Sequence, residues 1–316
     1  MDTIEKTKEL LLTLFPVRRS AGQKAEFRKW LVKELKRAGH KATEESYGKY
    51  NGTVNVIAGD PDRATVFLAA HYDTATRMLL PNFVSPTNPF FHVGYHFLVG
   101  FVLVVLALVL SFAVTFPVDR PDLTFPLFVI FAVGILLVTA YGPANKHNAN
   151  NNTSGVLALL SIVREMPKNE RICYVFFDNN ERSLLGAKSF KKKHPGAERA
   201  LVIDFNCVGN GEKILLMPSK YSRWDEEMMA ALDEAFDGVD AIRLINQGLV
   251  YYPTDGRKFK FHLSVAACRK GLFGYHIPYL NSKKDTQLDC GNVRLLAEGM
   301  TRFLPAYLAQ GEEKKV

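Results

Sequence analysis

The chain has 316 residues, of which 47% are hydrophobic and 23% charged, and its formal net charge is +8 at pH 7. This length gives one large domain or two ordinary ones, and the absence of a low-complexity tract excludes disordered and fibrous proteins. The four cysteines are scattered and form no CxxC pair, so neither a disulfide framework nor a cysteine zinc knuckle is indicated. They are Cys173, Cys207, Cys268 and Cys290.

Two amphipathic helices are predicted at the start of the chain. Residues 4–14 have apolar side chains at helical spacing, and residues 21–38 repeat the pattern until Gly39 ends it. Short apolar strands then alternate with helical stretches, which predicts an α/β fold with a mixed, mainly parallel sheet flanked by helices. The predicted strands are residues 53–58, 65–70, 172–178 and 200–205, and the helical stretches include 154–165 and 184–194.

Two long uncharged segments interrupt this pattern at residues 97–116 and 123–141. As helices, each would be roughly 30 Å long, which is the hydrocarbon thickness of a bilayer. Buried core helices are the alternative interpretation, but neither segment has a polar face. The six-residue linker between them suits a tight hairpin. The sequence therefore predicts a discontinuous α/β domain, residues 1–94 and 142–316, interrupted by a transmembrane helical hairpin, residues 95–141.

The distribution of basic residues predicts the orientation of this hairpin. Fourteen Lys and Arg residues precede the hairpin and 25 follow it, whereas its tip holds only Arg120, between Asp119 and Asp122. By the positive-inside rule, the α/β domain and both termini are cytoplasmic and the tip is outside. The charged residues 1–15 do not resemble a signal peptide. Cytoplasmic cysteines are reduced thiols, and the positive charge is assigned to contact with the lipid bilayer, because no motif indicates nucleic acid.

Polar residues follow the predicted strands at one edge of the sheet. His71 and Asp73 follow residues 65–70, Glu181 follows residues 172–178, and Asp204 lies within residues 200–205. In α/β sheets, ligands bind at the carboxyl ends of the strands. A single His or Asp in such a place is more often structural. Imidazole and carboxylate groups at three successive strand ends instead indicate a metal such as zinc.

Five motifs in this order resemble the zinc aminopeptidases of metallopeptidase family twenty-eight, the aminopeptidase Y type. The motifs are HYD (71–73), NANNNTSG (148–155), FFDNNERSLLGAKSF (176–190), LVIDFNCVG (201–209) and NSKKDT (281–286). The resemblance covers nearly all of the chain outside the hairpin. It implies two zinc ions that share a bridging carboxylate, and a glutamate that acts as general base on the water between them.

Three metal-ligand positions and one orienting position of the family are retained, and three positions are changed. The retained ligands fall on His71, Glu181 and Asp204, and Asp73 matches the aspartate that orients the first histidine. The changed positions are the bridging aspartate, the general base and the last histidine ligand, which fall on Asn151, Asn180 and Asn281. A neutral amide offers one carbonyl oxygen and cannot accept a proton near pH 7. The remaining set is compatible with no zinc or with one weakly bound zinc, and not with a dinuclear hydrolytic centre.

Other side chains near these motifs are candidates for a replaced function. Another histidine is a candidate ligand, and a lysine ammonium is a candidate replacement for the metal. These residues are His147, His262, His276, Lys283 and Lys284. The simpler interpretation, which we favour, is that each of them is a solvated loop residue. The crowded asparagines of residues 148–152 are likewise explained by a hydrogen-bonded turn.

The hairpin is inserted between the HYD and NANNNTSG motifs. The resemblance implies that these motifs are neighbouring loops at one edge of the sheet, so the pocket is expected to face the cytoplasmic leaflet. This arrangement suits a membrane-presented substrate or partner, and it equally suits a simple anchor. Three functions follow. The first is a membrane-anchored aminopeptidase-like protein that has lost peptide hydrolysis and binds a peptide or membrane-protein partner. The second is a divergent metallohydrolase with one metal and a different base, and the third is a purely structural membrane protein.

Overall fold

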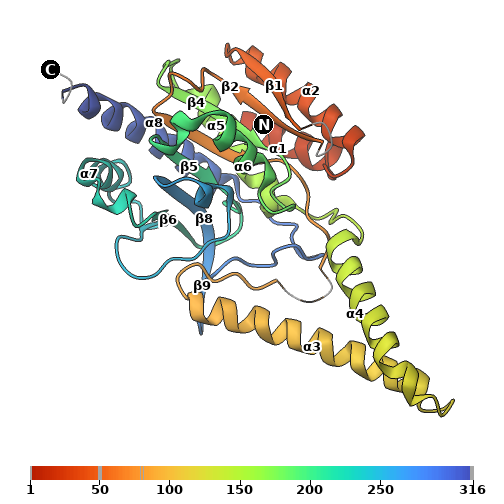
Figure 1. Ribbon diagram of the computed structural model, residues 1–316. Coiled ribbons are helices and arrows are strands. Elements are labelled where there is room, and N and C mark those ends of the chain that lie inside the picture. The colour runs from red at the N-terminus through yellow and green to blue at the C-terminus, as the bar shows by residue number, and fades with distance from the viewer. Residues whose placement is uncertain (1, 49–51, 79, 81, 314–316) are drawn as a thin grey trace.

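The computed structural model describes residues 2–48, 52–78, 80 and 82–313. Within this range, nine strands form a single sheet in the order β1-β2-β4-β3-β5-β8-β6-β7, with β9 paired to β8 (Figure 1). The strands are β1 (Ala42–Tyr47), β2 (Thr53–Ala58), β3 (Val66–His71), β4 (Ile172–Phe177), β5 (Leu201–Phe205), β6 (Lys213–Pro218), β7 (Ile242–Leu244), β8 (His262–Gly271) and β9 (Gly274–His276).

The centre of the sheet is parallel. Strands β4, β3, β5 and β8 are parallel neighbours, and Ala69 of β3 is in register with Val175 on one side and Asp204 on the other. The pairs β1–β2, β2–β4, β6–β8 and β8–β9 are antiparallel, whereas β6 and β7 are parallel. The predicted mixed α/β sheet is therefore confirmed. Its parallel centre aligns the carboxyl ends of β3, β4 and β5 at one edge.

Helices cover both faces of this sheet. The helices are α1 (Thr3–Leu14), α2 (Ala21–Arg37), α5 (Gly155–Glu165), α6 (Leu185–Lys193), α7 (Glu226–Ala235) and α8 (Cys290–Glu313). Short helical turns complete the chain: η1 (Pro121–Leu123), η2 (Ala149–Ser154), η3 (Pro195–Glu198), η4 (Ser222–Trp224) and η5 (Asp255–Lys258). The α1, α2, α5, α7 and α8 helices share one hydrophobic core with the sheet, and α6 packs in a second core on the other face.

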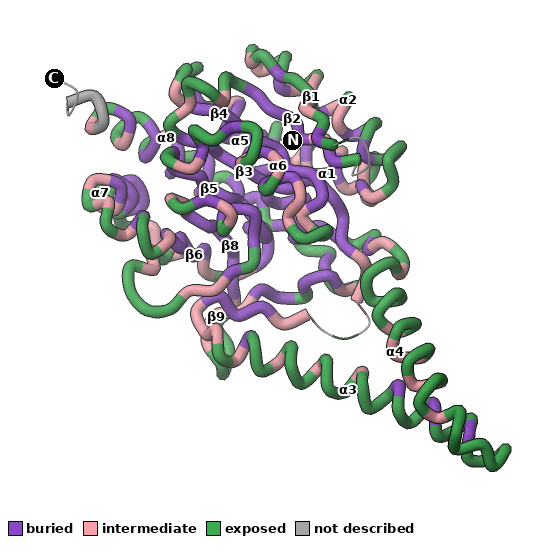
Figure 2. Tube along the Cα trace, viewed as in Figure 1, coloured by how far each residue is buried: buried purple, intermediate pink, exposed green. Residues whose placement is uncertain are grey.

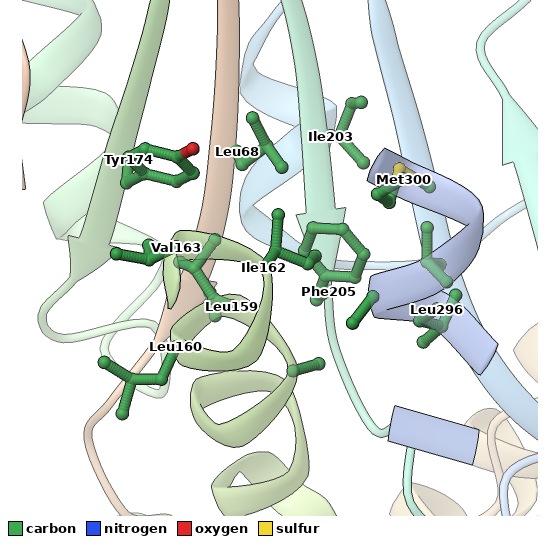
Figure 3. Close-up of a cluster of buried hydrophobic side chains, with 14 of the residues drawn as sticks. Leu68, Leu159, Leu160, Ile162, Val163, Tyr174, Ile203, Phe205, Leu296 and Met300 are labelled. Atoms are coloured by element: carbon green, nitrogen blue, oxygen red, sulfur yellow. The ribbon is translucent and has the colours of Figure 1, made fainter. Parts of the chain in front are cut away.

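Alternation along the strands separates these two cores. Leu68 of β3 lies in one buried cluster with Leu159 of α5 and Met300 of α8 (Figure 3), whereas the neighbouring Phe67 packs against Phe190 of α6. Successive strand side chains point to opposite faces, so an apolar strand serves both layers. Burial of each such side chain contributes about 1.5–3 kcal/mol. The two-sided core holds the sheet edge that carries the polar residues in place.

The two apolar segments form a long helical hairpin outside the sheet. Helix α3 (Pro89–Thr115) and helix α4 (Thr124–Tyr141) extend away from the α/β domain (Figure 1), and most of their residues are exposed (Figure 2). Helix α3 starts earlier than predicted, because the Asn88 side chain caps it by accepting the Phe91 N–H at 3.1 Å. Residues 89–94, assigned to the α/β domain from sequence, are therefore the first turns of the hairpin.

A buried arginine ties the N-terminal segment to the sheet and to the loop before α5. The guanidinium of Arg18, which is fully buried, donates to the carbonyls of Tyr72 and Phe15 and to the Thr153 hydroxyl, at 3.0 Å for the last. Burial lowers the pKa of Arg18 to about 10, and the charge of Asp73 opposes that effect. The group is therefore charged at neutral pH and satisfies three acceptors at once, those of the buried Tyr72 and Thr153 and the half-buried Phe15.

We expect Arg18→Leu to lower the free energy of unfolding by about 3 kcal/mol or more, since it leaves these acceptors unpaired inside the protein. Urea unfolding of the detergent-solubilised chain, followed by circular dichroism, measures the change. Arg63→Leu is the matched control, because Arg63 forms only exposed ion pairs with Asp60 and Glu170 and is expected to cost less than about 1 kcal/mol. Equal losses for both variants would contradict the anchoring role of Arg18.

Candidate active site

The polar residues predicted from sequence gather at the carboxyl edge of the parallel strands. His71 is the last residue of β3, Asp204 lies within β5, and Glu181 lies in the loop after β4. A cavity of about 400 Å³ opens at this edge, and we call it the asparagine pocket. Four of its lining residues stand at positions that the resemblance assigns to a metal ligand or the general base, namely Asn151, Asn180, Glu181 and Asn281. His71 and Asp204 lie fully buried beside it and do not line it.

The side chain of Asp73 contacts both His71 and the loop that carries Asn180 and Glu181. Its carboxylate accepts the backbone N–H groups of Asn180 at 2.9 Å and Glu181 at 3.1 Å, and Oδ1 lies 3.3 Å from Nδ1 of His71. Burial opposes a positive charge on His71, but the hydrogen bond and charge of Asp73, with those of Glu181 and Asp255, raise the pKa of His71 to about 9. Burial also opposes the charge on Asp73, yet His71 lowers its pKa overall. The two residues form a buried ion pair behind the pocket.

Asn151 occupies the centre of a neutral amide network. Its side-chain amide donates to Oε1 of Glu181 at 3.1 Å and to Oδ1 of Asn281 at 2.5 Å, and its own oxygen accepts the thiol of Cys207 at 3.6 Å. Because a carboxylate only accepts hydrogen bonds, the nitrogen of the Asn151 amide must face Glu181. The residue that the resemblance places at the bridging position therefore points its N–H groups at Glu181 and Asn281, whereas a metal ligand must offer a lone pair of electrons.

Asn180 likewise acts as a donor, toward a residue that sequence reasoning missed. Its side-chain amide donates to Oδ2 of Asp255 at 2.9 Å, and Asp255 is fully buried at the start of η5. Burial raises the pKa of Asp255 well above its usual range, and the charge of Asp204 adds to this effect. Burial also raises the pKa of Asp204. Asp255 stands in a turn far along the chain from any motif, so only the tertiary fold brings it to the site.

The asparagines of residues 148–152, which we call the asparagine loop, connect the strand ends. The Asn152 amide donates to the Phe205 carbonyl at 3.0 Å and accepts the Cys207 N–H at 2.9 Å. The Asp285 carboxylate accepts the N–H groups of Asn150 and Asn151 at 2.7 and 3.0 Å. The hydrogen-bonded turn considered from sequence is thus present. Through Phe205 and Asp285 it also links the end of β5 to the last motif, residues 281–286.

Several alternative candidates from sequence lie elsewhere. His147, Lys283 and Lys284 are exposed, and Lys284 lies over the ring of Tyr279 at 5.8 Å, so neither lysine replaces a metal beside Glu181 and Asp204. His262 begins β8 and His276 stacks on Phe83; neither lines the asparagine pocket. The histidines that do line it are His92 and His96, on the first turns of α3. Sequence reasoning missed them because neither lies in one of the five motifs.

The described residues do not fit the family's dinuclear zinc centre. Among them, no group of three or more His, Cys, Asp or Glu side chains is arranged to hold a metal ion. The bridging position is an amide whose nitrogen faces the site, and Asn281 is held by the same amide. One contrary feature remains: Nε2 of His71, Oδ1 of Asp204 and Oδ1 of Asp255 are buried without hydrogen-bond partners. The two carboxylate oxygens are acceptors available to a single cation, and Nε2 of His71 joins them only when the imidazole is neutral.

The α/β sheet, its helices and the motif-bearing edge define a zinc-exopeptidase-like fold. The family model of peptidase family M28 matches residues 136–284, and together with the fold it confirms the resemblance of this chain to that family as a divergent relative. No curated protein sequence matches the chain.

Three solved structures illustrate the shared fold. The glutaminyl cyclase of Porphyromonas gingivalis has a TM-score of 0.62 and 16% identity, over 96% of this chain and 98% of that one. The LapA aminopeptidase of Legionella pneumophila has a TM-score of 0.58 and 12% identity, over 97% and 69%. A Zn-dependent exopeptidase from Parabacteroides distasonis has a TM-score of 0.57 and 18% identity, over 96% and 98%. At these identities the likeness establishes the fold, and function must be argued from the site.

The buried Asp285 generates a prediction about pH. Burial raises its pKa to about 7, against the effect of the two N–H groups that it accepts. The folded state therefore keeps this proton up to about pH 7, whereas the unfolded chain releases it near pH 4, so this group stabilises the fold below pH 4 and loses that contribution as the pH rises to about 7.

We expect Asp285→Asn to flatten the decline of stability between pH 5 and 8, because the variant has no proton to release at this position. Urea unfolding midpoints of both proteins at these pH values give the slopes. Asp233→Asn, a change at an exposed carboxylate of α7, is the control and is expected to keep the wild-type slope. An unchanged slope in Asp285→Asn would show that this carboxyl does not titrate as described.

Proposed function

We propose that this chain is a membrane-anchored aminopeptidase-like protein that has lost dizinc peptide hydrolysis and uses its pocket for binding. The observation that carries the proposal is the Asn151 amide, which donates to Glu181 and Asn281 at the place where the family has an anionic bridge. Two divalent cations carry four positive charges, and a neutral amide supplies none of the compensating charge.

The general-base position supports the same conclusion. Asn180 donates its amide to Asp255, and an amide cannot take a proton from water near pH 7. General acid–base catalysis typically contributes a factor of roughly 10² to 10⁴ in rate. Loss of the base and of the bridging ligand together removes both the proton acceptor and the metal-based activation of water.

The backbone around the pocket supports retention of a binding role over a vestigial pocket. Four lining residues that are not glycine adopt left-handed backbone conformations with φ between 57° and 60°. They are Ser183, Leu184, Cys207 and Asn281. Such conformations carry an energetic cost and gather at functional sites.

The lining indicates the chemistry of the ligand. Glu181 is exposed toward the opening, and the walls add the apolar side chains of Val84, Leu184 and Leu280. A carboxylate at the end of a partly apolar pocket suits a cationic amine followed by an apolar side chain. We therefore assign the amino-terminal end of a peptide as the ligand class.

The hairpin supports placement of this pocket at a bilayer. The segments Pro89–Thr115 and Pro121–Tyr141 each contain an 18-residue apolar stretch, with mean hydropathies of 3.1 and 2.5. Only 11% and 0% of these stretches are buried. Core helices of a soluble protein would be mostly buried, and a signal sequence would stand near the N-terminus. We propose that both helices cross the membrane, with the α/β domain and both termini cytoplasmic. His92 and His96 of α3 line the pocket, which suits a ligand presented at the membrane.

A divergent metallohydrolase with one metal and a different base is the second candidate. It is favoured by the buried, unpartnered atoms of His71, Asp204 and Asp255. Asp255 has the raised pKa that suits a proton-transferring group. Metal content and activity distinguish the two candidates.

We expect the purified wild-type chain to hold less than about one equivalent of tightly bound zinc and to show no aminopeptidase turnover above background. The triple reversion Asn151→Asp, Asn180→Glu and Asn281→His is expected to restore zinc binding, because it returns the bridging and terminal ligands to an intact frame. Atomic absorption and hydrolysis of aminoacyl substrates measure both. The same triple variant with His71→Ala is the control, and it should bind less zinc. Zinc-dependent hydrolysis by the wild type, abolished by His71→Ala, would establish the metallohydrolase instead.

The topology is tested by thiol labelling. The four native cysteines are buried and free, so an engineered cysteine dominates labelling by an impermeant maleimide. In sealed vesicles with the cytoplasmic face outward, we expect Lys146→Cys to be labelled directly and Asp119→Cys only after the membrane is permeabilised. The reverse pattern would invert the topology, and direct labelling of both would contradict a spanning hairpin.

A further inference from the structure

A second and larger cavity lies on the other side of Tyr252 from the asparagine pocket, and Tyr252 lines both. This basic cavity has a volume of about 600 Å³ and is bounded by the end of β6, by η4 and η5, and by the start of β8. Its walls carry six basic side chains and one carboxylate, that of Glu198. The cations are Lys191, Lys220, Arg223, Arg257, Lys258 and Lys260.

Most of these cations have no carboxylate partner. Lys191 pairs with Glu198 at 2.6 Å. Within the part of the chain that the structure describes, none of the other five forms an ion pair. The six cations and one carboxylate leave a net charge of +5 around one cavity. Such a concentration of one charge repels itself and attracts a multivalent anion.

Aromatic and backbone contacts hold these cations in fixed positions. The ammonium groups of Lys220 and Lys260 lie 4.8 and 5.0 Å from the ring centroid of Tyr221. Arg257 lies over Tyr251 at 4.3 Å. Cations held over aromatic rings lose less freedom when a ligand arrives.

Arg223 adds an unfilled donor. Its Nη1 group donates to the Gly248 carbonyl at 2.8 Å, whereas its Nε–H is buried without a hydrogen-bond partner. A guanidinium fixed by one bond and left with a free N–H is well suited to a phosphate oxygen. Burial, together with the charges of Lys188 and Arg257, lowers the pKa of Lys258, which agrees with uncompensated positive charge in this region.

We propose that the basic cavity binds a small phosphate-bearing polyanion. The chemistry is shared by a soluble phosphate compound and by a phosphorylated lipid headgroup. The volume is that of a small-molecule site, and the cations come from α6, from η4 and η5, and from the turns beside these two, which converge on one space. This site is distinct from the asparagine pocket and does not depend on the function proposed for that pocket.

The test uses the full chain in phosphatidylcholine nanodiscs, with tripolyphosphate as the soluble probe and a phosphatidylinositol bisphosphate in the disc as the lipid probe. The readout is the fluorescence of Trp224, an exposed residue of η4 beside the cavity. We expect saturable binding of at least one probe. The combined change Arg223→Gln, Lys258→Gln and Lys260→Gln should raise its Kd at least about tenfold.

Two controls separate a built site from general charge attraction. Lys192→Gln removes an exposed cation of α6 outside the cavity and should leave the Kd unchanged. The pocket reversion Asn151→Asp should also leave it unchanged, which distinguishes this site from the proposed function. Response to tripolyphosphate identifies a soluble ligand, and response only to the lipid identifies a headgroup. Absence of saturable binding, equal weakening by Lys192→Gln, or equal competition by sulfate would overturn the proposal.

Discussion

The hydrogen bonds of the asparagine loop set the geometry on which the pocket depends. Asn152 joins the end of β5 to the next turn through the Phe205 carbonyl and the Cys207 N–H, and Asn150 accepts the Gly209 N–H at 2.8 Å. A buried side-chain amide needs partners for its N–H donors and for its oxygen acceptor, so each of these asparagines requires particular groups beside it. Helix α5 begins directly after the loop, where a Cβ on Gly155 would lie 2.2 Å from the Phe205 carbonyl oxygen. The close approach of helix and strand follows from the same contacts.

One change of residue type inside this loop alters the chemistry of the whole site. An aspartate at position 151 would bring a second negative charge beside Glu181, and a cation would be needed to hold the two together. An asparagine at that position donates to Glu181 directly and needs no cation. The pocket thus keeps its shape and its supporting residue Asp73, while its centre becomes a neutral network. The proposed binding role rests on this combination of a preserved fold and a changed centre.

The hairpin and the two cavities present three chemically different surfaces. The first turns of α3 form part of the asparagine pocket through His92 and His96, so the hairpin helix and the pocket share a wall. The link between the pocket and the basic cavity is Tyr252, whose hydroxyl donates to the Asn206 carbonyl at 3.0 Å. In the proposed placement beside a bilayer, the apolar surface of the hairpin contacts lipid and the cationic surface of the basic cavity remains in water.

The sequence by itself determined the strands of the sheet centre, the two apolar spans and the motif positions, because periodicity, charge and residue type are local properties. It indicated His71, Glu181 and Asp204 at one edge, but it counted residues 89–94 with the α/β domain. Only the tertiary structure decided that Asp255 pairs with Asn180, that α3 lines the pocket and that six cations surround a second cavity. These arrangements join residues far apart in the chain, and their geometry depends on how loops pack, which no local pattern records.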